Sequence, residues 1–591
     1  MSPVLEFFPA KSGVLTARAV LSDGSSFLLH SAYDPVAEAR RLLERHPALK
    51  EAGAAVFVGL GLGYHVEEAL REMRDDARIL VVEKNPDLIA RFWKRVSVHP
   101  ERIEITDREN EIKTFLYRNR DAVRRGFVLV EHPASVRTDP GFYALVRQRV
   151  RDYVSLMLTD VATAKVLSRS VQENIFTNLT TVVEDPGIVA LKDVFQGRPA
   201  VIVAAGPSLN KNVHLLAEAK NRSVIICVGT ALKALLAQDL RPDLVVTLDP
   251  TEGNYRLFEG AAVKDEYLCY EPQTHYKIPC LFRDRRFAFN SFVSPLSLWL
   301  RQLYGDKGYA EPGGSVAIAA FGIACQIGAN PIVFIGQDLA YTDGHTHARG
   351  TVYEDRKVDL QAANPNLLRA PGIDGSTVVT SRNMHTFLVR FEELFAEHKD
   401  RLIIDATEGG ALKRGTVVMS FREAIDRYFT EEFPVLPVIE ECHRRHRPDP
   451  AVRGRVREAL EKTAREYDDF IPRLEEILSL ADRVQELNDL AEKISDKSGK
   501  LGHGTLQALK KKGEELNALL KEVNAQAKLV DLLSLLSYDV QLLSPLPEDA
   551  PLKEQLQRIK FVYGLYLEAA KTTRGQMDRA AANLGGVPGA G

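Results

Sequence analysis

The stretch RPAVIVAAGPSLNKN, Arg198 to Asn212, decides the fold of this chain. It reads as a short apolar strand that ends in Gly206-Pro207-Ser208 and leads into a helix. Similar apolar runs follow in SVIICVGT, PDLVVTLDP, NPIVFIGQD and RLIIDATEGG, with helical stretches between them. Short apolar strands that alternate with helices are typical of a doubly wound parallel sheet. The sequence therefore predicts an α/β domain built around this strand.

Polar residues follow these strands. They are Gly206, Pro207, Ser208, Thr230, Asp249, Gln337 and Asp338. Because the carboxyl ends of parallel strands share one edge of a sheet, where ligands bind, these residues are expected to line one cleft. The sequence predicts a cleft of nucleotide size at this edge.

The turn Pro312-Gly313-Gly314-Ser315 directly precedes a helical stretch. Such a turn offers unpaired N–H groups and a hydroxyl to an anion, which suits a phosphate. The alternative is an ordinary serine N-cap after a flexible turn.

A polar loop follows Asp338 and contains Tyr341, Asp343, His345 and His347. Histidine is the side chain best suited to act as a general base near neutral pH. His345 and His347 could instead bind a metal together with Asp338 or Asp343, or they could be solvated loop residues. His385 begins a further helix and is a second candidate base.

A second glycine-rich turn, Gly59-Leu60-Gly61-Leu62-Gly63, lies between an apolar strand and a helix, and Glu83 ends the next strand. The pattern resembles the S-adenosylmethionine-binding loop of Rossmann-like methyltransferases. That family usually has an acid two places before the first glycine, where this chain has Phe57. The alternative is a tight turn that keeps its glycines without a cofactor.

The chain has 591 residues, which is too long for one core. We expect two Rossmann-like α/β domains followed by an α-helical bundle: an N-terminal domain over residues 1–139, a helical connector over 140–185, a central domain over 186–430 and the bundle over 431–591. The connector carries several polar residues, including Gln172, Asn174 and Asn178.

Composition narrows the function. The net charge of -3 provides no global field for nucleic acid or an anionic membrane. The five cysteines lack CxxC or CxxH spacing, so neither a disulfide framework nor a zinc site is expected. No signal peptide or apolar run of membrane-spanning length is recognisable. The protein is expected to be soluble and cytoplasmic.

Four segments, PAVIVAAGPSLNKN, DLVVTLDP, PGGSVAIAAFGIACQIGANPIVFIGQDLAYTDGHTHA and DATEGGALKRG, resemble the flagellin glycosyltransferases called motility-associated factors. The resemblance covers residues 186–425 and, in layout, the flanking regions. It implies a central domain similar to bacterial sialyltransferases. It also implies transfer of a nonulosonic acid (pseudaminic, legionaminic or a related sugar) from its CMP-activated form to Ser or Thr of flagellin, as flagellum assembly and motility require. No other cofactor is implied, and a divalent metal is not indicated.

The resemblance also implies site residues. Tyr341 matches the first of two tyrosines that hold the donor phosphate in sialyltransferases, and His347 falls near the second. The catalytic histidine of those enzymes corresponds to Thr380-Ser381 here, so we expect His347 to be the base, with His385 as the alternative. The implied catalytic residues are His347, Tyr341, Asp338 and His385, and the implied donor-binding residues are Gly206, Pro207, Ser208, Thr230, Asp249, Gly313, Gly314, Ser315 and Gln337.

Two other functions stay open. The Gly-Pro-Ser-Leu and Gly-x-Asp patterns also resemble archaeal-type hydroxymethylpterin pyrophosphokinases, which transfer diphosphate from ATP and need Mg²⁺. Such enzymes are much shorter than 591 residues. The non-catalytic alternative is a flagellin chaperone that has kept a degenerate transferase fold. In the transferase hypothesis the helical region, with or without the first domain, is expected to dock flagellin.

Overall fold

The computed structural model describes residues 3–96, 99–291, 293–311, 314–361, 364, 366–498, 503–541, 543, 546 and 550–586. The chain divides into two compact units. The first unit is Met1–Lys165 with Tyr538–Glu548, and the second is Val166–Ser537 with Asp549–Gly591. The central domain and the helical region that the sequence distinguishes therefore share one unit, and the boundary between the units falls inside the predicted connector.

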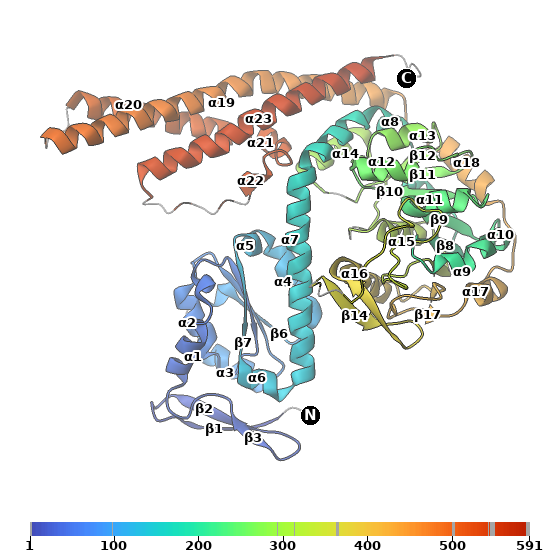
Figure 1. The fold of residues 1–591 in the computed structure, drawn as a ribbon. Helices are drawn as coiled ribbons and strands as arrows, with labels where there is room; N and C mark the ends of the chain where they lie inside the picture. The colour runs from blue at the N-terminus through green and yellow to red at the C-terminus, as the bar shows by residue number, and fades with distance from the viewer. Residues whose placement is uncertain are drawn as a thin grey trace. The chain divides into compact units, whose positions relative to one another are not determined.

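A four-stranded parallel sheet organises the first unit, in the order β6-β5-β4-β7 (Figure 1). Its strands are β4 (Ala54–Val58), β5 (Arg78–Val82), β6 (Ile103–Thr106) and β7 (Phe127–Glu131), and a small antiparallel sheet holds β1 (Val4–Pro9), β2 (Leu15–Val20) and β3 (Ser26–Leu28). The helices are α1 (Pro35–Leu43), α2 (Tyr64–Glu72), α3 (Pro86–Arg95), α4 (Glu109–Arg118), α5 (Arg120–Arg124), α6 (Pro133–Thr138), α22 (Tyr538–Gln541) and the first part of α7 (Pro140–Thr177). Val56 and Phe57 belong to two different buried clusters, because successive side chains point to opposite faces of the sheet and both faces are covered.

An eight-stranded parallel sheet organises the second unit, in the order β12-β11-β10-β9-β8-β13-β16-β17. The strands are β8 (Ala200–Val203), β9 (Val224–Val228), β10 (Leu244–Thr247), β11 (Tyr267–Tyr270), β12 (Arg286–Ala288), β13 (Ile332–Ile335), β16 (Ile403–Asp405) and β17 (Val417–Val418). A hairpin of β14 (Leu367–Pro371) and β15 (Thr377–Ser381) lies outside this sheet. The predicted α/β class, with parallel sheets and a C-terminal helical region, is confirmed.

The helices of the second unit pack against the large sheet. Helix α15 (Val316–Gln326) is apolar on all sides and contacts β8, β9 and β10, as expected for a helix buried on every face. The helices around the sheet are α8 (Leu179–Glu184), α9 (Leu209–Asn212), α10 (Leu216–Ala219), α11 (Gly229–Leu236), α12 (Glu252–Phe258), α13 (Lys277–Leu281), α14 (Pro295–Tyr304), α15 (Val316–Gln326), α16 (Arg382–Glu397), α17 (Phe421–Tyr428) and α18 (Val435–Arg445).

The polar residues of the predicted connector fasten α7 to the second unit. Nδ2 of Asn174 donates to the carbonyl of Pro250 at 2.9 Å, and Nδ2 of Asn178 donates to the carbonyl of Thr274 at 2.7 Å. Nε2 of Gln172 donates to side chains of α23 (Leu552–Gly585). These buried amides therefore tie the end of α7, and Asn178 just after it, to the loops at the sheet edge and to the helical region.

The helical region consists of α19 (Ala451–Ser498), α20 (His503–Asn524), α21 (Ala527–Leu532) and α23, and α19 lies beside both α20 and α23 (Figure 1). Buried residues of α19, such as Val456 and Tyr467, belong to the same apolar cluster as Val201 of the sheet. The sheet and these helices therefore share one core. None of the described helices combines the length and the apolar character needed to cross a membrane.

Candidate active site

The crevice of the large sheet lies between β8 and β13. The chain passes from β8 outward through β9, β10, β11 and β12, and then returns to the other side of β8 as β13. The loops that follow β8 and β13 therefore diverge, and such a topological switch point is where ligands bind in open α/β sheets. The two loops are residues 204–208 and residues 336–341.

Ser208 and Asp338 join these two loops. The backbone N–H of Ser208 donates to Oδ2 of Asp338 at 3.1 Å, and its hydroxyl donates to Oδ1 at 2.6 Å. The N–H of Gly206 donates to the carbonyl of Gly336 at 2.7 Å. The structure thus brings together the strand-end residues that the sequence singled out after β8 and β13.

The carboxylate of Asp338 is a buried organising group. Burial raises its pKa, while the hydrogen bonds from Ser208 and the charge of Lys413 oppose that rise. Oγ1 of Thr342 donates to the same carboxylate at 3.3 Å, and the N–H of Ala411 donates to the carbonyl of Asp338 at 2.8 Å. Asp338 is therefore held from several sides and fixes the turn after β8.

Gln337 presents an unsatisfied acceptor next to Asp338. Its side chain is buried, and Oε1 meets no hydrogen-bond donor among the residues that the structure describes. Leaving such an acceptor unpaired costs about 1–3 kcal/mol, which a donating ligand would recover. The following loop is strained, since Leu339 and Asp343 have φ of 50° and 51°. Strain of this kind clusters at ligand sites.

The loop that carries His347 lies against the same crevice. The N–H of Ala348 donates to the carbonyl of Ala205 at 2.9 Å, and the N–H of Arg349 donates to Oδ1 of Asn210 at 3.0 Å. These bonds place His347 beside the turn that follows β8.

The hydrogen bonds of His347 determine its tautomer. Nδ1 lies 2.8 Å from Oγ1 of Thr346, and that hydroxyl donates its one proton to the carbonyl of Arg356 at 3.2 Å. With the hydroxyl donating to Arg356, Oγ1 accepts from Nδ1–H and the lone pair lies on Nε2; a hydroxyl that donates to Nδ1 would give the opposite tautomer. Burial, with a smaller effect from Arg356, lowers the pKa of His347 below its ordinary value of 6.5. At neutral pH the imidazole is uncharged, and Nε2 can accept a proton.

Tyr341 lies on the same loop, which is fixed to β15. The N–H of Tyr341 donates to the carbonyl of Val379 at 2.9 Å. Oγ1 of Thr380 donates to the carbonyl of Leu339 at 2.7 Å. Ser381 then caps α16, and His385 lies in the first turns of that helix. These bonds tie the start of α16 to the Tyr341 loop. Hydrogen bonds of its neighbouring residues place His347 at the crevice, whereas no such bond is found for His385 among the described contacts.

The alternative of a metal site gains no support from this loop. His345 pairs through its backbone with Thr342 and Lys357. Within the described ranges, no group of three or more His, Cys, Asp or Glu side chains could hold a metal ion.

Ser315 is the N-cap of α15, and its side chain makes no capping bond to that helix. Because α15 leads into β13 and runs opposite to the strands, its N-terminus faces the carboxyl edge of the sheet. Gly314 has φ of 71°, and a Cβ there would lie 3.3 Å from Phe387 of α16. Gly313 lies outside the described residues. Ser315 and the first N–H groups of α15 are therefore available to an anion at this edge.

Thr230 and Asp249 follow the next two strands. Thr230 is half-buried in the first turn of α11. Oδ1 of Asp249 accepts from the N–H of Thr251 at 2.8 Å, and the carbonyl of Asp249 accepts from Nδ2 of Asn254 at 2.8 Å. Asp249 therefore shapes the loop after β10 in addition to lining the edge.

The sequence reasoning missed polar residues after β11 and β12. Glu271 is 2% exposed and accepts from both the N–H and the hydroxyl of Ser291, at 3.0 and 2.8 Å. Nε2 of His275 lies 2.8 Å from Oε2 of Glu252, and the ring stacks against Tyr255. The signal was the segment EPQTH after the apolar run YLCY. That run is too short to mark a strand by its pattern alone.

Side chains of the first unit accept the N–H groups of its glycine-rich loop. The N–H groups of Leu60, Gly61 and Leu62 donate to Glu83, Ser135 and His30 respectively. A Cβ on Gly61 would lie 2.5 Å from the ring of His30. The loop therefore offers these N–H groups to its own side chains, which favours the interpretation as a tight turn.

Replacing Gly206 by alanine should damage the crevice. The new Cβ would lie 2.1 Å from Oδ1 of Asp338 and 2.6 Å from the carbonyl oxygen of Gly336, which accepts the N–H of Gly206 itself. We expect a loss of about 1–3 kcal/mol in unfolding free energy, as for other overpacked positions, together with loss of the nucleotide binding that the sequence predicts for this cleft. Urea unfolding and nucleotide titration measure both effects.

Gly253→Ala is the matched control for that variant. Its Cβ would meet only Oγ1 of Thr251, at 3.5 Å, inside the helix α12. It should be neutral or stabilise by about 0.5–1 kcal/mol. A Gly206→Ala protein as stable and as competent in binding as this control would contradict the close packing at the crevice.

Comparison with known proteins places these features in context. The family model for MptE-like 6-hydroxymethylpterin diphosphokinases matches residues 173–344. An uncharacterized protein of Treponema pallidum (strain Nichols) is 28% identical over 233 residues, which is 36% of this chain and 37% of that protein. The 6-hydroxymethyl-7,8-dihydropterin pyrophosphokinase of Methanocaldococcus jannaschii is 34% identical over 91 residues, 15% of this chain and 34% of that enzyme. The chain therefore matches only about a third of the length of these relatives.

A solved structure matches the whole chain. The MAf glycosyltransferase from Magnetospirillum magneticum AMB-1 aligns with 100% of this chain and 94% of its own, with a TM-score of 0.52 and 14% sequence identity. This agreement confirms the resemblance to motility-associated factors at the level of the fold. The chain thus has the fold of a MAf glycosyltransferase over its full length.

Proposed function

We propose that this protein is a glycosyltransferase that moves a nonulosonic acid from a CMP-activated donor to Ser or Thr of flagellin in the cytoplasm. The observation that carries the proposal is the crevice between β8 and β13, where the Ser208–Asp338 bond, the unpaired amide oxygen of Gln337 and the loop of His347 converge. The full-length fold agreement with a MAf glycosyltransferase supports it.

The donor would lie along the carboxyl edge of the sheet. Its phosphate suits the N-terminus of α15, where the Ser315 hydroxyl makes no capping bond and the helix dipole favours negative charge. The nucleoside would lie against the glycine turn after β8, with Thr230 and Asp249 farther along the same edge. Oε1 of Gln337 would accept an amino or hydroxyl proton of the nucleoside.

The reaction needs a base and a stabilised leaving group. Departure of the CMP phosphate leaves an oxocarbenium-like anomeric carbon, and the acceptor hydroxyl attacks as it loses its proton. We assign the proton acceptor to Nε2 of His347 and phosphate contact to the Tyr341 hydroxyl. Asp338 acts as a positioning residue because its carboxylate is engaged by Ser208 and Thr342. His385 is the alternative base.

The decisive assay combines purified protein, a CMP-nonulosonic acid and flagellin. Intact-mass and peptide mass spectrometry should detect one sugar mass per modified Ser or Thr. Flagellin that binds the protein but gains no sugar with any CMP-activated nonulosonic acid would favour the chaperone alternative. We also propose that the helical region is part of the acceptor-binding surface, and a pull-down of flagellin by the full chain measures acceptor binding apart from transfer.

Diphosphate transfer to a pterin is the second candidate function. The family model over residues 173–344 and the similarity to the archaeal pyrophosphokinase favour it. The family model spans residues 173–344, which contain β8 to β13 and leave the helical region and the first unit outside the match. Incubation with ATP, Mg²⁺ and 6-hydroxymethyl-7,8-dihydropterin should yield AMP only if this alternative holds.

Gln337→Met should separate binding from stability. Removing the unpaired buried amide oxygen should leave the free protein as stable or about 1 kcal/mol more stable, while CMP affinity falls about tenfold because a ligand donor loses its acceptor. Thermal unfolding with and without CMP measures both quantities. Gln238→Met, at an exposed glutamine, is the control and should change neither. Unchanged CMP affinity in Gln337→Met would remove Gln337 from the donor site.

A further inference from the structure

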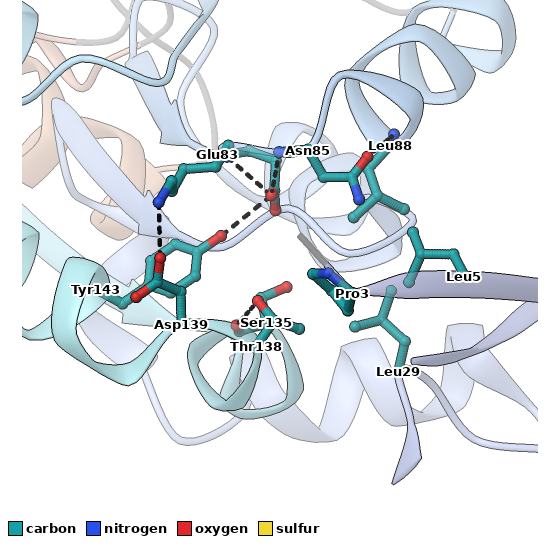
Figure 2. A pocket seen from close by; sticks show the side chains of 11 residues that line it. Pro3, Leu5, Leu29, Glu83, Asn85, Leu88, Ser135, Thr138, Asp139 and Tyr143 are labelled. Atoms are coloured by element: carbon teal, nitrogen blue, oxygen red, sulfur yellow. Dashed lines mark hydrogen bonds and ion pairs between the residues drawn. The ribbon is translucent and has the colours of Figure 1, made fainter. Parts of the chain in front are cut away.

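The first unit holds a cavity of about 220 Å³ at the carboxyl end of β5, which Figure 2 shows from close by. The Glu83 carboxylate on its wall already accepts from three backbone N–H groups and from the Tyr143 hydroxyl. The ammonium group of Lys84, also on the wall, pairs with Asp139 at 2.7 Å. These polar groups are therefore satisfied within the first unit, which is not the case for an arginine beside His347 in the second unit.

Arg356 is an exposed residue on the loop that carries His347. Its carbonyl accepts from the N–H and from the hydroxyl of Thr346, both at 3.2 Å. Its own N–H donates to the carbonyl of Tyr353 at 3.0 Å. The backbone of Arg356 is therefore fixed beside the segment of the loop that leads to His347.

The Tyr353 ring connects the side chain of Arg356 with that of His347. Cζ of Arg356 lies 4.0 Å from the centre of this ring, and the centre of the imidazole ring lies 5.1 Å from it. Stacking on an aromatic face holds a guanidinium in place and leaves the N–H groups in its plane free to bind a ligand. The pKa of His347 reflects the same proximity, because burial lowers it most and the charge of Arg356 lowers it further. A fixed cation therefore lies next to the proposed base.

The guanidinium of Arg356 has no carboxylate partner among the residues that the structure describes. Its acidic neighbour Glu354 instead accepts from the N–H of Gly350 at 2.6 Å. The charged residues that follow Tyr341 on this loop are Asp343, Arg349, Glu354, Asp355, Arg356, Lys357 and Asp359. The loop as a whole is thus not basic. An anion would be bound by direct hydrogen bonds to the guanidinium and not by a general positive field.

The chemistry of the donor calls for such a group, and the inference rests here on the proposed function. A CMP-activated nonulosonic acid carries two anionic groups, which are the phosphodiester and the carboxylate of the sugar. The N-terminus of α15 suits the phosphodiester. The carboxylate is bonded to the anomeric carbon, so the group that binds it must lie near the base that activates the attacking hydroxyl.

Other cations near the crevice are engaged elsewhere. Lys413 is fully buried and pairs with Asp405. Nζ of Lys211 donates to the carbonyl of Glu408 at 2.7 Å. Of the three cations on the loop, Arg356 is the one with a described contact to the Tyr353 ring. It is therefore the cation best placed to meet the sugar beside His347.

We propose that Arg356 binds the carboxylate of the donor sugar through two parallel hydrogen bonds and so places the anomeric carbon next to the hydroxyl that His347 deprotonates. The planar fork of a guanidinium matches the two oxygens of a carboxylate in this way. Arg356 thereby selects sugars with a carboxylate on the anomeric carbon over neutral sugars on the same nucleotide.

Calorimetric titration of the full chain tests this contact. The probes are CMP, the tighter-binding of CMP-pseudaminic and CMP-legionaminic acid, and the methyl ester of that donor. Arg356→Gln should weaken donor binding about tenfold or more because a charged hydrogen-bonded pair is lost, whereas CMP, which has no carboxylate, should bind as before. Arg356→Lys keeps the charge without the fork and should recover part of the affinity. The methyl ester should bind the native chain about as weakly as the free acid binds Arg356→Gln.

Lys357→Gln is the matched control, because it removes the same charge from the adjacent exposed position, and it should leave donor affinity unchanged. The inference would be overturned by unchanged donor affinity in Arg356→Gln, by an equal loss of CMP and donor affinity in that variant, or by an equal loss of donor affinity in Lys357→Gln. A methyl ester that binds the native chain as tightly as the free acid would also overturn it, and this comparison needs no variant. A native chain that binds neither donor would overturn the proposed function itself and the inference with it.

Discussion

In the proposed reaction, His347→Ala should lower the rate of sugar transfer to flagellin by about 10²–10⁴-fold, which is the usual contribution of a positioned general base. The reason is that the imidazole is uncharged and that, with the Thr346 hydroxyl donating to Arg356, Nε2 carries the lone pair that accepts the proton of the acceptor hydroxyl. CMP binding should change little, because the variant removes the proton acceptor and leaves the β8 turn intact. Single-turnover mass spectrometry of flagellin, alongside CMP titration, separates the two effects.

The pH dependence follows from the direction of the His347 pKa. Burial lowers that pKa below 6.5, so the neutral, active form prevails above the lowered pKa and is lost as pH falls through it. The native enzyme should therefore show an acidic limb that lies below pH 6.5, and Thr346→Val should reduce the rate and move this limb. His345→Ala, two residues away, is the control and should retain the rate. Equal losses in His345→Ala and His347→Ala, or a full rate in His347→Ala with a loss in His385→Ala, would assign the base elsewhere.

Much of the sheet was predictable because several of its strands are short, wholly apolar runs followed by turn signals. In VIVAAGPSL and PIVFIGQD the polar loop directly follows the strand, so the sequence alone predicts that Ser208 and Asp338 lie at one edge of the sheet. Strands such as Arg286–Ala288 were missed because three residues show no periodicity, and tertiary contacts define them.

The pairing of side chains across the crevice could not be predicted. Nothing in the sequence spacing states that Ser208 donates to Asp338, or that Thr346 and Arg356 set the tautomer of His347. The glycine loop of the first unit illustrates the same limit. Its pattern matches a cofactor loop, yet the side chains of His30 and Ser135, distant in sequence, accept its N–H groups.

A buried ion pair lies at the end of β16, next to the loop that contacts Asp338. Nζ of Lys413 lies 2.8 Å from Oδ2 of Asp405, and both side chains are 0% exposed. Asp405 ends β16, and the loop between the two residues donates the N–H of Ala411 to the carbonyl of Asp338. The charge of Lys413 also lowers the pKa of Asp338 against the effect of burial. The ion pair thus connects the stability of the sheet to the geometry of the proposed donor site.

Lys413→Met should therefore destabilise the second unit by about 3–5 kcal/mol, because it leaves the carboxylate of Asp405 buried without its partner. Urea unfolding measures the loss, and CMP affinity should fall with it. Adding Asp405→Leu should restore most of the stability, since an apolar pair of similar volume removes the unpaired charge. Arg422→Met, which breaks the exposed Arg422–Glu218 pair, is the matched control and should cost at most about 1 kcal/mol. If Lys413→Met cost no more than this control, the buried pair would not stabilise the crevice.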